Sequence, residues 1–292
     1  MIARIVRRFS RPRRSIRRLA AAVCLATALS AASAAPGGAA VTIGQTVAPT
    51  TVCGSQVDRL QPTVTSGNTY VVPPTVSSGI ITSWSTQAVA GGGMLAMKVY
   101  RPLGGLTYLV VGHEGPHALV GGALNTFPAS VAVKAGDVLG LSTPPSAGQP
   151  GCLFEITGES GSLRRDGILA DGESGEFMAG ANPDRRVNIS ALVSPTNAFT
   201  LGDLDRNKKK GTAKLTVNIS NPGELVLSGK GLRRREKAPG AAGDVVLKIK
   251  ANKNKLDRLE ENGKVKVKPK ITFTPTGGDP SAQSRKLKLR KR

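Results

Sequence analysis

The chain has 292 residues, 39% of them hydrophobic, which is enough to fill one large core or two smaller ones. Aromatic residues make up only 3%, whereas 35 glycines and 19 prolines favour short strands and turns over long helices. The net charge is +22, but it is unevenly distributed: residues 1–35 carry +8, residues 36–198 carry −2 and residues 199–292 carry +16. This distribution argues against a nucleic-acid binder that is basic along its whole length.

The first 34 residues have the features of a cleaved signal peptide. Eight arginines and no acidic residue precede an apolar, alanine-rich stretch from Leu19 to about Ala32, too short for a mature membrane anchor. Ala32-Ser33-Ala34 then fits the Ala-x-Ala pattern of signal-peptidase sites, and Ala40 is a possible later site. Both the general secretory route and the twin-arginine route stay open. We expect a secreted protein with no transmembrane segment after cleavage.

The cysteines are consistent with export. Removing residues 1–34 discards Cys24 and leaves the pair Cys53 and Cys152. In an oxidising compartment such a pair usually forms a disulfide. The chain has no Cys-x-x-Cys motif that would indicate a zinc or redox site. We therefore predict a disulfide and no cofactor.

Residues 35–198 are predicted to form an antiparallel β-sandwich, either a jelly roll or an Ig-like fold. Short β-type runs alternate with turn-forming residues, and so many short strands need two sheets to bury their apolar faces. Residues 95–100 alternate in the manner of a half-buried strand. The turn Lys134–Asp137 lies between two such runs and predicts a hairpin. The lone Trp84 is expected in the core.

Two motifs in this region could hold a metal. His113-Glu114-Gly115-Pro116-His117 has the H-E-x-x-H spacing of zinc peptidases, which requires a helix. Pro116 disfavours that helix and the chain has no third histidine, so we expect a hairpin turn and no enzyme. The alternative is a secreted metal-dependent hydrolase that uses His113, Glu114 and His117. A separate acidic group could either bind calcium or form a solvated loop: Asp166, Asp171, Glu173 and Glu176.

Residues 199–292 are predicted to form a smaller Ig-like β-sandwich. Apolar residues alternate with polar ones in several runs, as in Leu215, Val217 and Ile219, which places one face in a core and leaves lysines on the other. One short helix is expected over Lys253–Asn262, with Asn252 or Asn254 as its N-cap and Gly263 as its stop.

The stretch from Gly263 to Ser281, Gly-Lys-Val-Lys-Val-Lys-Pro-Lys-Ile-Thr-Phe-Thr-Pro-Thr-Gly-Gly-Asp-Pro-Ser, precedes a lysine-rich last strand. It resembles the C-terminal Ig-like module of uncharacterised secreted proteins of high-GC Gram-positive bacteria. The resemblance covers about the last third of the chain and implies fold and surface location, without catalytic residues or a ligand. Residues 125–141 are similar, less specifically, to extracellular jelly-roll modules.

The lysines of the last region are the remaining candidate site. A polar outer face alone accounts for lysines but not for a net charge of +16, which should attract polyanions. Nucleic acid is disfavoured because Phe199 and Phe273 are the only aromatic residues here, too few for base stacking. We expect contacts with anionic cell-wall polymers or polysaccharide, the alternative being a solvated face. The candidates are Lys248, Lys250, Lys264, Lys266, Lys268, Lys286 and Lys288.

Overall fold

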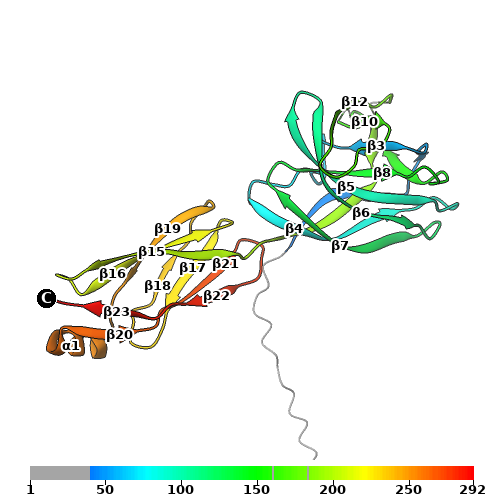
Figure 1. Ribbon diagram of the computed structural model, residues 1–292. Helices are drawn as coiled ribbons and strands as arrows, with labels where there is room; N and C mark the ends of the chain where they lie inside the picture. The colour runs from blue at the N-terminus through cyan, green and yellow to red at the C-terminus, as the bar shows by residue number, and fades with distance from the viewer. Residues whose placement is uncertain (1–39, 160, 183) are drawn as a thin grey trace, which may run out of the picture. The chain divides into compact units, whose positions relative to one another are not determined.

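The computed structural model describes residues 40–159, 161–182 and 184–292, and these residues fold into antiparallel β-sheets with one short helix (Figure 1). The prediction of an all-β, antiparallel sandwich architecture is confirmed. The predicted signal segment, residues 1–34, lies outside the described residues. Among the described residues no helix is long and apolar enough to cross a membrane.

Three sheets are formed by strands from residues 41–195. The four-stranded sheet has the order β1 (Val41–Gln45), β14 (Ile189–Pro195), β4 (Ser78–Gln87), β7 (Leu124–Lys134). The seven-stranded sheet has the order β11 (Ser174–Glu176), β6 (Thr107–Ala118), β5 (Met94–Gly104), β8 (Val138–Thr143), β3 (Val57–Leu60), β10 (Leu163–Asp166), β12 (Met178–Ala179). The third sheet has the order β13 (Arg185–Val187), β9 (Gly151–Glu155), β2 (Thr51–Val52).

Strand β5 lies between two apolar clusters, which corrects the expectation that it is half buried. Residues 95–100 are all buried. Leu95, Met97 and Val99 pack in the larger cluster with Trp84, whereas Tyr100 packs in a second, smaller cluster. Both faces of β5 are therefore buried here, although its sequence alternates apolar residues with a set that includes Lys98. A lysine can occupy the second face because its charge is paired there, as described below.

The turn at Lys134–Asp137 has the predicted position, but the strands on either side of it do not form a hairpin. Strand β7 pairs with β4, whereas β8 pairs with β5 and β3 in the other sheet. The Asp137 carboxylate accepts a hydrogen bond from the Lys134 backbone N–H at 2.7 Å and closes the turn. The chain thus crosses from one sheet to the other at this point.

Cys53 and Cys152 form the predicted disulfide, with a Cα–Cα distance of 5.8 Å and 99 residues of sequence separation. Both side chains are buried within the larger apolar cluster. The bridge connects the segment that follows β2 to strand β9, which pairs with β2. Trp84 is also buried, as predicted, with its ring centroid 4.9 Å from that of Phe127.

Residues 199–292 form three further sheets. The first has the order β15 (Phe199–Asn207), β16 (Thr212–Ile219), β19 (Gly243–Ile249). The second has the order β18 (Arg235–Lys237), β17 (Gly223–Ser228), β21 (Lys270–Pro275), β22 (Ser281–Ser284), and the third pairs β20 (Lys264–Val267) with β23 (Leu287–Arg290). We call residues 199–292 the C-terminal module. One apolar cluster, from Phe199 to Leu289, fills it.

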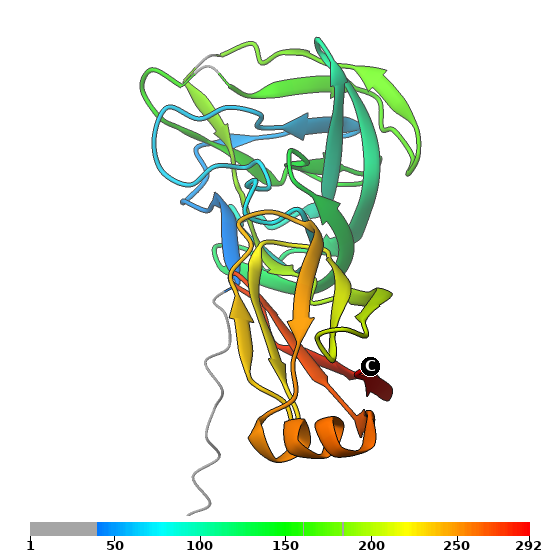
Figure 2. The ribbon, with the colours of Figure 1, turned by 90° about the vertical axis from the view of Figure 1, so that its left-hand side faces the viewer.

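The helix of this module follows the prediction closely. Helix α1 (Lys253–Asn262) is capped by Asn252, whose side-chain oxygen accepts from the Lys255 backbone N–H at 3.2 Å. It ends at Gly263, whose φ of 63° is the left-handed conformation that glycine adopts most easily. Figure 2 shows α1 across one end of the module, and only Leu259 of the helix is buried.

Candidate functional site

The His113–His117 segment lies within strand β6 rather than in a hairpin turn, which corrects the sequence-based expectation. Strand β6 pairs with β5 through the segment, with a register shift inside it between Glu114 and His117. Gly115 has φ 98° and precedes a cis peptide bond to Pro116. The irregular glycine–proline pair is accommodated as a bulge, and the strand continues to Ala118. The helix that a zinc-peptidase motif needs is not formed.

The two histidines of this segment are held by different carboxylates. His113 Nδ1 lies 2.8 Å from Oδ1 of Asp171, on the loop before β11. His117 Nε2 lies 2.7 Å from Oε1 of Glu114, whose other oxygen accepts from the Trp84 indole N–H at 2.5 Å. The His117 ring also stacks on Phe127. Glu114 thus fixes a histidine and a tryptophan, and the three motif residues do not converge on one point.

The acidic residues considered for calcium are also dispersed among separate partners. Asp166 forms an ion pair with Arg164 at 2.6 Å, and Asp171 holds His113. Glu173 accepts from the Ala170 backbone N–H at 2.8 Å, while Glu176 is exposed at the end of β11. Among the described residues no group of three or more His, Cys, Asp or Glu side chains is placed to hold a metal ion.

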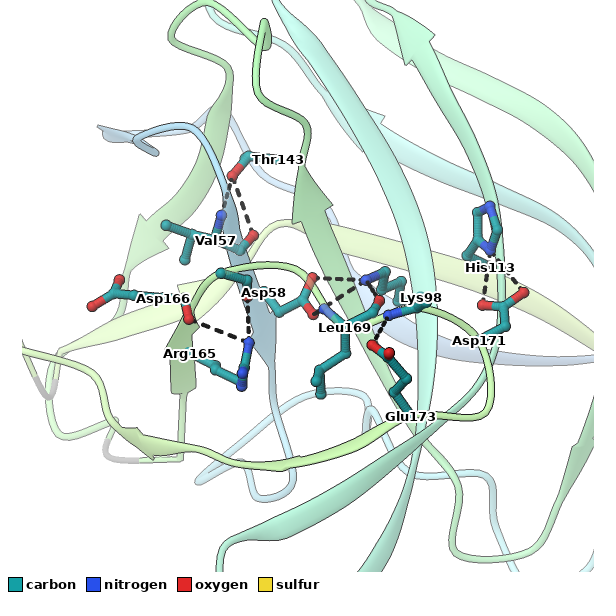
Figure 3. A network of polar contacts seen from close by, with 12 residues as sticks. Val57, Asp58, Lys98, His113, Thr143, Arg165, Asp166, Leu169, Asp171 and Glu173 are labelled. Atoms are coloured by element: carbon teal, nitrogen blue, oxygen red, sulfur yellow. Dashed lines mark hydrogen bonds and ion pairs between the residues drawn. The ribbon is translucent and has the colours of Figure 1, made fainter.

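A buried ion pair that sequence patterns did not indicate lies beside this segment (Figure 3). The Lys98 ammonium donates to both carboxylate oxygens of Asp58, at 3.0 and 3.1 Å, and to the Leu169 carbonyl at 2.5 Å. The Leu169 N–H in turn donates to Asp58 at 3.0 Å. All three ammonium protons are therefore used, and the pair ties the Leu169 loop to β3 and β5.

Tyr100 lies in the apolar cluster beside this pair. Burial, and then the negative charge of Asp58, raise the pKa of Tyr100 well above its ordinary value. Its buried hydroxyl has no hydrogen-bond partner of ordinary geometry among the described residues. The phenol is accordingly neutral and serves as a core side chain.

A cavity of about 430 Å³ opens above the ion pair, between the Leu169 loop and β6. Lys98, Ser142, His113 and Asp171 supply its polar lining, and the other lining residues are apolar: Ala96, Pro116, Pro144, Ile168, Leu169 and Ala170. The Lys98 charge is neutralised and the His113–Asp171 pair is half exposed at the mouth. This lining can accept a small apolar group, and its charged side chains, Lys98 and Asp171, are both engaged with partners.

The C-terminal module has a different kind of pocket, of about 570 Å³, lined almost entirely by lysines. The lysine pocket, as we call it, is formed by Lys230, Lys255, Lys266, Lys268, Lys286 and Lys288, with Val267 and Leu287 between them. These lysines come from α1, from β20 and β23, and from the loops beside them. None of the six forms an ion pair with a described residue, and no carboxylate lines the pocket.

Local structure explains how lysines so far apart in sequence come together. Strands β20 and β23 pair, with Lys266 directly opposite Lys288. Their apolar neighbours Val267 and Leu287 are buried, so the lysines project outward together. Gly231 has φ 84°, and a Cβ there would lie 2.4 Å from the Lys255 side chain, so glycine lets the Lys230 loop approach the helix.

A second basic pocket, of about 220 Å³, includes Lys210, Arg233, Lys248 and Lys250. The pKa of Lys250 is lowered mainly by the positive charge of Lys248. Partial burial and the charges of Arg235, Arg233 and Lys210 lower it further. Lys248 and Lys250 thus gather in this pocket, whereas Lys264 lines neither pocket and lies opposite Arg290. Lys230 and Lys255 were missed from the sequence because strand alternation identifies only residues within strands.

The aromatic side chains considered as binding platforms lie in apolar cores rather than on the surface. Trp84, Tyr70, Tyr100 and Tyr108 are buried, and so are Phe199 and Phe273 of the C-terminal module. Stacking of sugars or bases, which needs an accessible ring face, therefore has no candidate in these side chains.

Comparison with known proteins adds no identification: no family model matches the chain, and a search of curated proteins found no match. The resemblance of the last third to Ig-like modules therefore stays a prediction.

Proposed function

We propose that this chain is an exported, non-enzymatic protein whose C-terminal module binds anionic cell-surface polymers through the lysine pocket. The observation that supports the proposal is the gathering of six unpaired lysines around one pocket. The pocket would attract a chain of negative charges, as wall polymers or anionic polysaccharides present. In this account the disulfide-bridged region, residues 35–198, is held near the cell surface by the module.

The arrangement of charge favours binding over mere solubility. A solvated protein face normally intersperses lysines with acidic residues, because like charges repel one another. The lysine pocket contains no carboxylate, and two of its lysines face each other across paired strands. Like charges in such positions destabilise the fold unless an anion neutralises them. A flexible ammonium recognises charge without demanding a planar partner, which suits a polymer with repeated phosphate or carboxylate groups.

The first test is binding to a soluble polyanion, such as long-chain polyphosphate, by the full chain. Lysine near an anionic surface contributes about 1 kcal/mol, so changing Lys266, Lys268 and Lys288 to Gln should weaken binding by about a hundred-fold at low salt. The affinity of the unmodified chain should fall linearly with salt on a double-logarithmic plot, and the slope should be smaller for this variant.

The matched control removes the same charge outside both basic pockets. Lys209, Lys214 and Lys270 are exposed on the same module and line neither of them. Changing these three to Gln should weaken binding much less than the pocket variant does. Equal weakening by both triple variants would show that only total charge matters, and the pocket would lose its assigned role.

A further inference from the structure

A second cluster of positive charge lies outside the C-terminal module, within a region whose net charge is −2. Arg59 on β3 is directly opposite Arg164 on β10 in the antiparallel pairing. Arg185, on β13 of another sheet, lies near enough for its charge to affect Arg59. We call these three residues the arginine cluster. Like charges directly opposite in a sheet are destabilising, so their juxtaposition needs a physical reason.

Most of the other basic side chains of this region have partners, and Lys134 is exposed at the end of β7. Lys98 is paired with Asp58, Arg101 with Asp137, and Arg186 with Glu159. Arg165 donates to the carbonyls of Asp166 and Gly167. Within the cluster, only Arg164 has a carboxylate, that of Asp166, and Arg59 and Arg185 form no ion pair with a described residue. Arg185 lies directly opposite Glu155 in the pairing of β13 with β9, but no ion pair joins them, so neither Arg59 nor Arg185 has a contacting carboxylate among the described residues.

The guanidinium groups also leave hydrogen-bond donors unused. Four buried side-chain N or O atoms among the described residues lack a hydrogen-bond partner, and three of them are the Nε atoms of Arg59, Arg164 and Arg185. A buried donor without an acceptor destabilises the folded chain, because it has lost its hydrogen bond to water. Burial, and then the charges of Arg164 and Arg185, lower the pKa of Arg59 to about 10, against the opposing effect of Asp166.

We propose that the arginine cluster is a binding site for a tetrahedral oxyanion, a phosphate or sulfate group. One such anion would neutralise the excess charge and accept several N–H donors at once. The guanidinium fork matches oxyanion geometry and forms paired hydrogen bonds, which an ammonium group cannot do. The site is independent of the lysine pocket, because its residues belong to β3, β10 and β13 and none to the C-terminal module.

The test observes the donors themselves. The full chain, labelled with ¹⁵N-arginine, is titrated at constant ionic strength with inorganic phosphate, methyl phosphate, sulfate or acetate, with chloride as the reference anion. The Nε–H signals of Arg59, Arg164 and Arg185, assigned through single Arg→Gln variants, should shift together and saturate at millimolar phosphate. A larger response to methyl phosphate than to inorganic phosphate would assign the site to phosphate esters, and the reverse to the free ion. Equal shifts with acetate would overturn the tetrahedral assignment.

Variants separate binding from general charge effects. Arg59→Lys retains the charge but loses the fork, and should weaken phosphate binding at least ten-fold while leaving the fold intact. Arg165→Gln, one residue from Arg164, should leave the titration unchanged. The Lys266, Lys268 and Lys288 triple variant should also leave it unchanged. Signals that stay still, or that shift without saturating as they do in chloride, would overturn the proposal.

Discussion

Replacing Asp58 with Ala should lower the free energy of unfolding by about 3–5 kcal/mol, because the Lys98 ammonium would remain buried without its counter-charge. Both side chains are almost inaccessible, with exposed fractions of 5% for Lys98 and 0% for Asp58. The change would also remove the acceptor of the Leu169 N–H and free the loop that bears Asp171. Denaturant titration of the full chain measures the loss.

Two controls distinguish the ion pair from general damage. Changing Asp58 to Leu and Lys98 to Met together should cost less than Asp58→Ala alone, since no buried charge would be left. Asp166→Ala breaks the partly exposed ion pair with Arg164 and should cost no more than about 1 kcal/mol. A double variant at least as unstable as the sum of its single variants would contradict the account of this pair.

Removal of the disulfide should have an effect of similar size. The bridge closes a loop between residues that are 99 positions apart, and the chain-entropy model gives about 5 kcal/mol for such a loop. Changing Cys53 and Cys152 to Ala should therefore lower the melting temperature markedly, and reduction of the unmodified chain should do the same. An unmodified chain that is equally stable when oxidised and reduced would contradict a stabilising bridge.

Most strands of the C-terminal module could be predicted from the sequence because they have one buried face. Leu215, Val217 and Ile219 are all buried, as their alternation with polar residues predicts. Asn252 and Gly263 are strong local signals that defined helix α1. These features depend on neighbours in sequence, so single-sequence reasoning could detect them.

The features that were missed depend on contacts between distant residues. Asp58 and Lys98 are 40 positions apart, and nothing near either residue in the sequence indicates their pairing. The strand β5 pattern was interpreted as half buried because alternation cannot distinguish solvent from a second core. The His113–His117 motif was correctly expected not to be helical, since Pro116 disfavours a helix, but its continuation of β6 depends on pairing with β5.

The lysine pocket could be predicted in part from local sequence patterns, and the rest of it depends on contacts between distant residues. Strand alternation predicted Lys266, Lys268, Lys286 and Lys288 on an outer face, and the structure places them around one pocket. Lys230 and Lys255 were added by the fold, through a glycine turn and the capped helix. The arginine cluster, by contrast, unites strands of two sheets and could not be predicted from local patterns.

Sedimentation with isolated Gram-positive cell walls is the most direct test of the proposed function. The full chain should sediment with walls that retain their anionic polymers and should be released as salt is raised. The unmodified chain should remain in solution when the walls have been stripped of those polymers. The Lys266, Lys268 and Lys288 triple variant should remain in solution even with intact walls. Equal retention on intact and extracted walls, or equal retention of the triple variant and the unmodified chain, would contradict the proposed function.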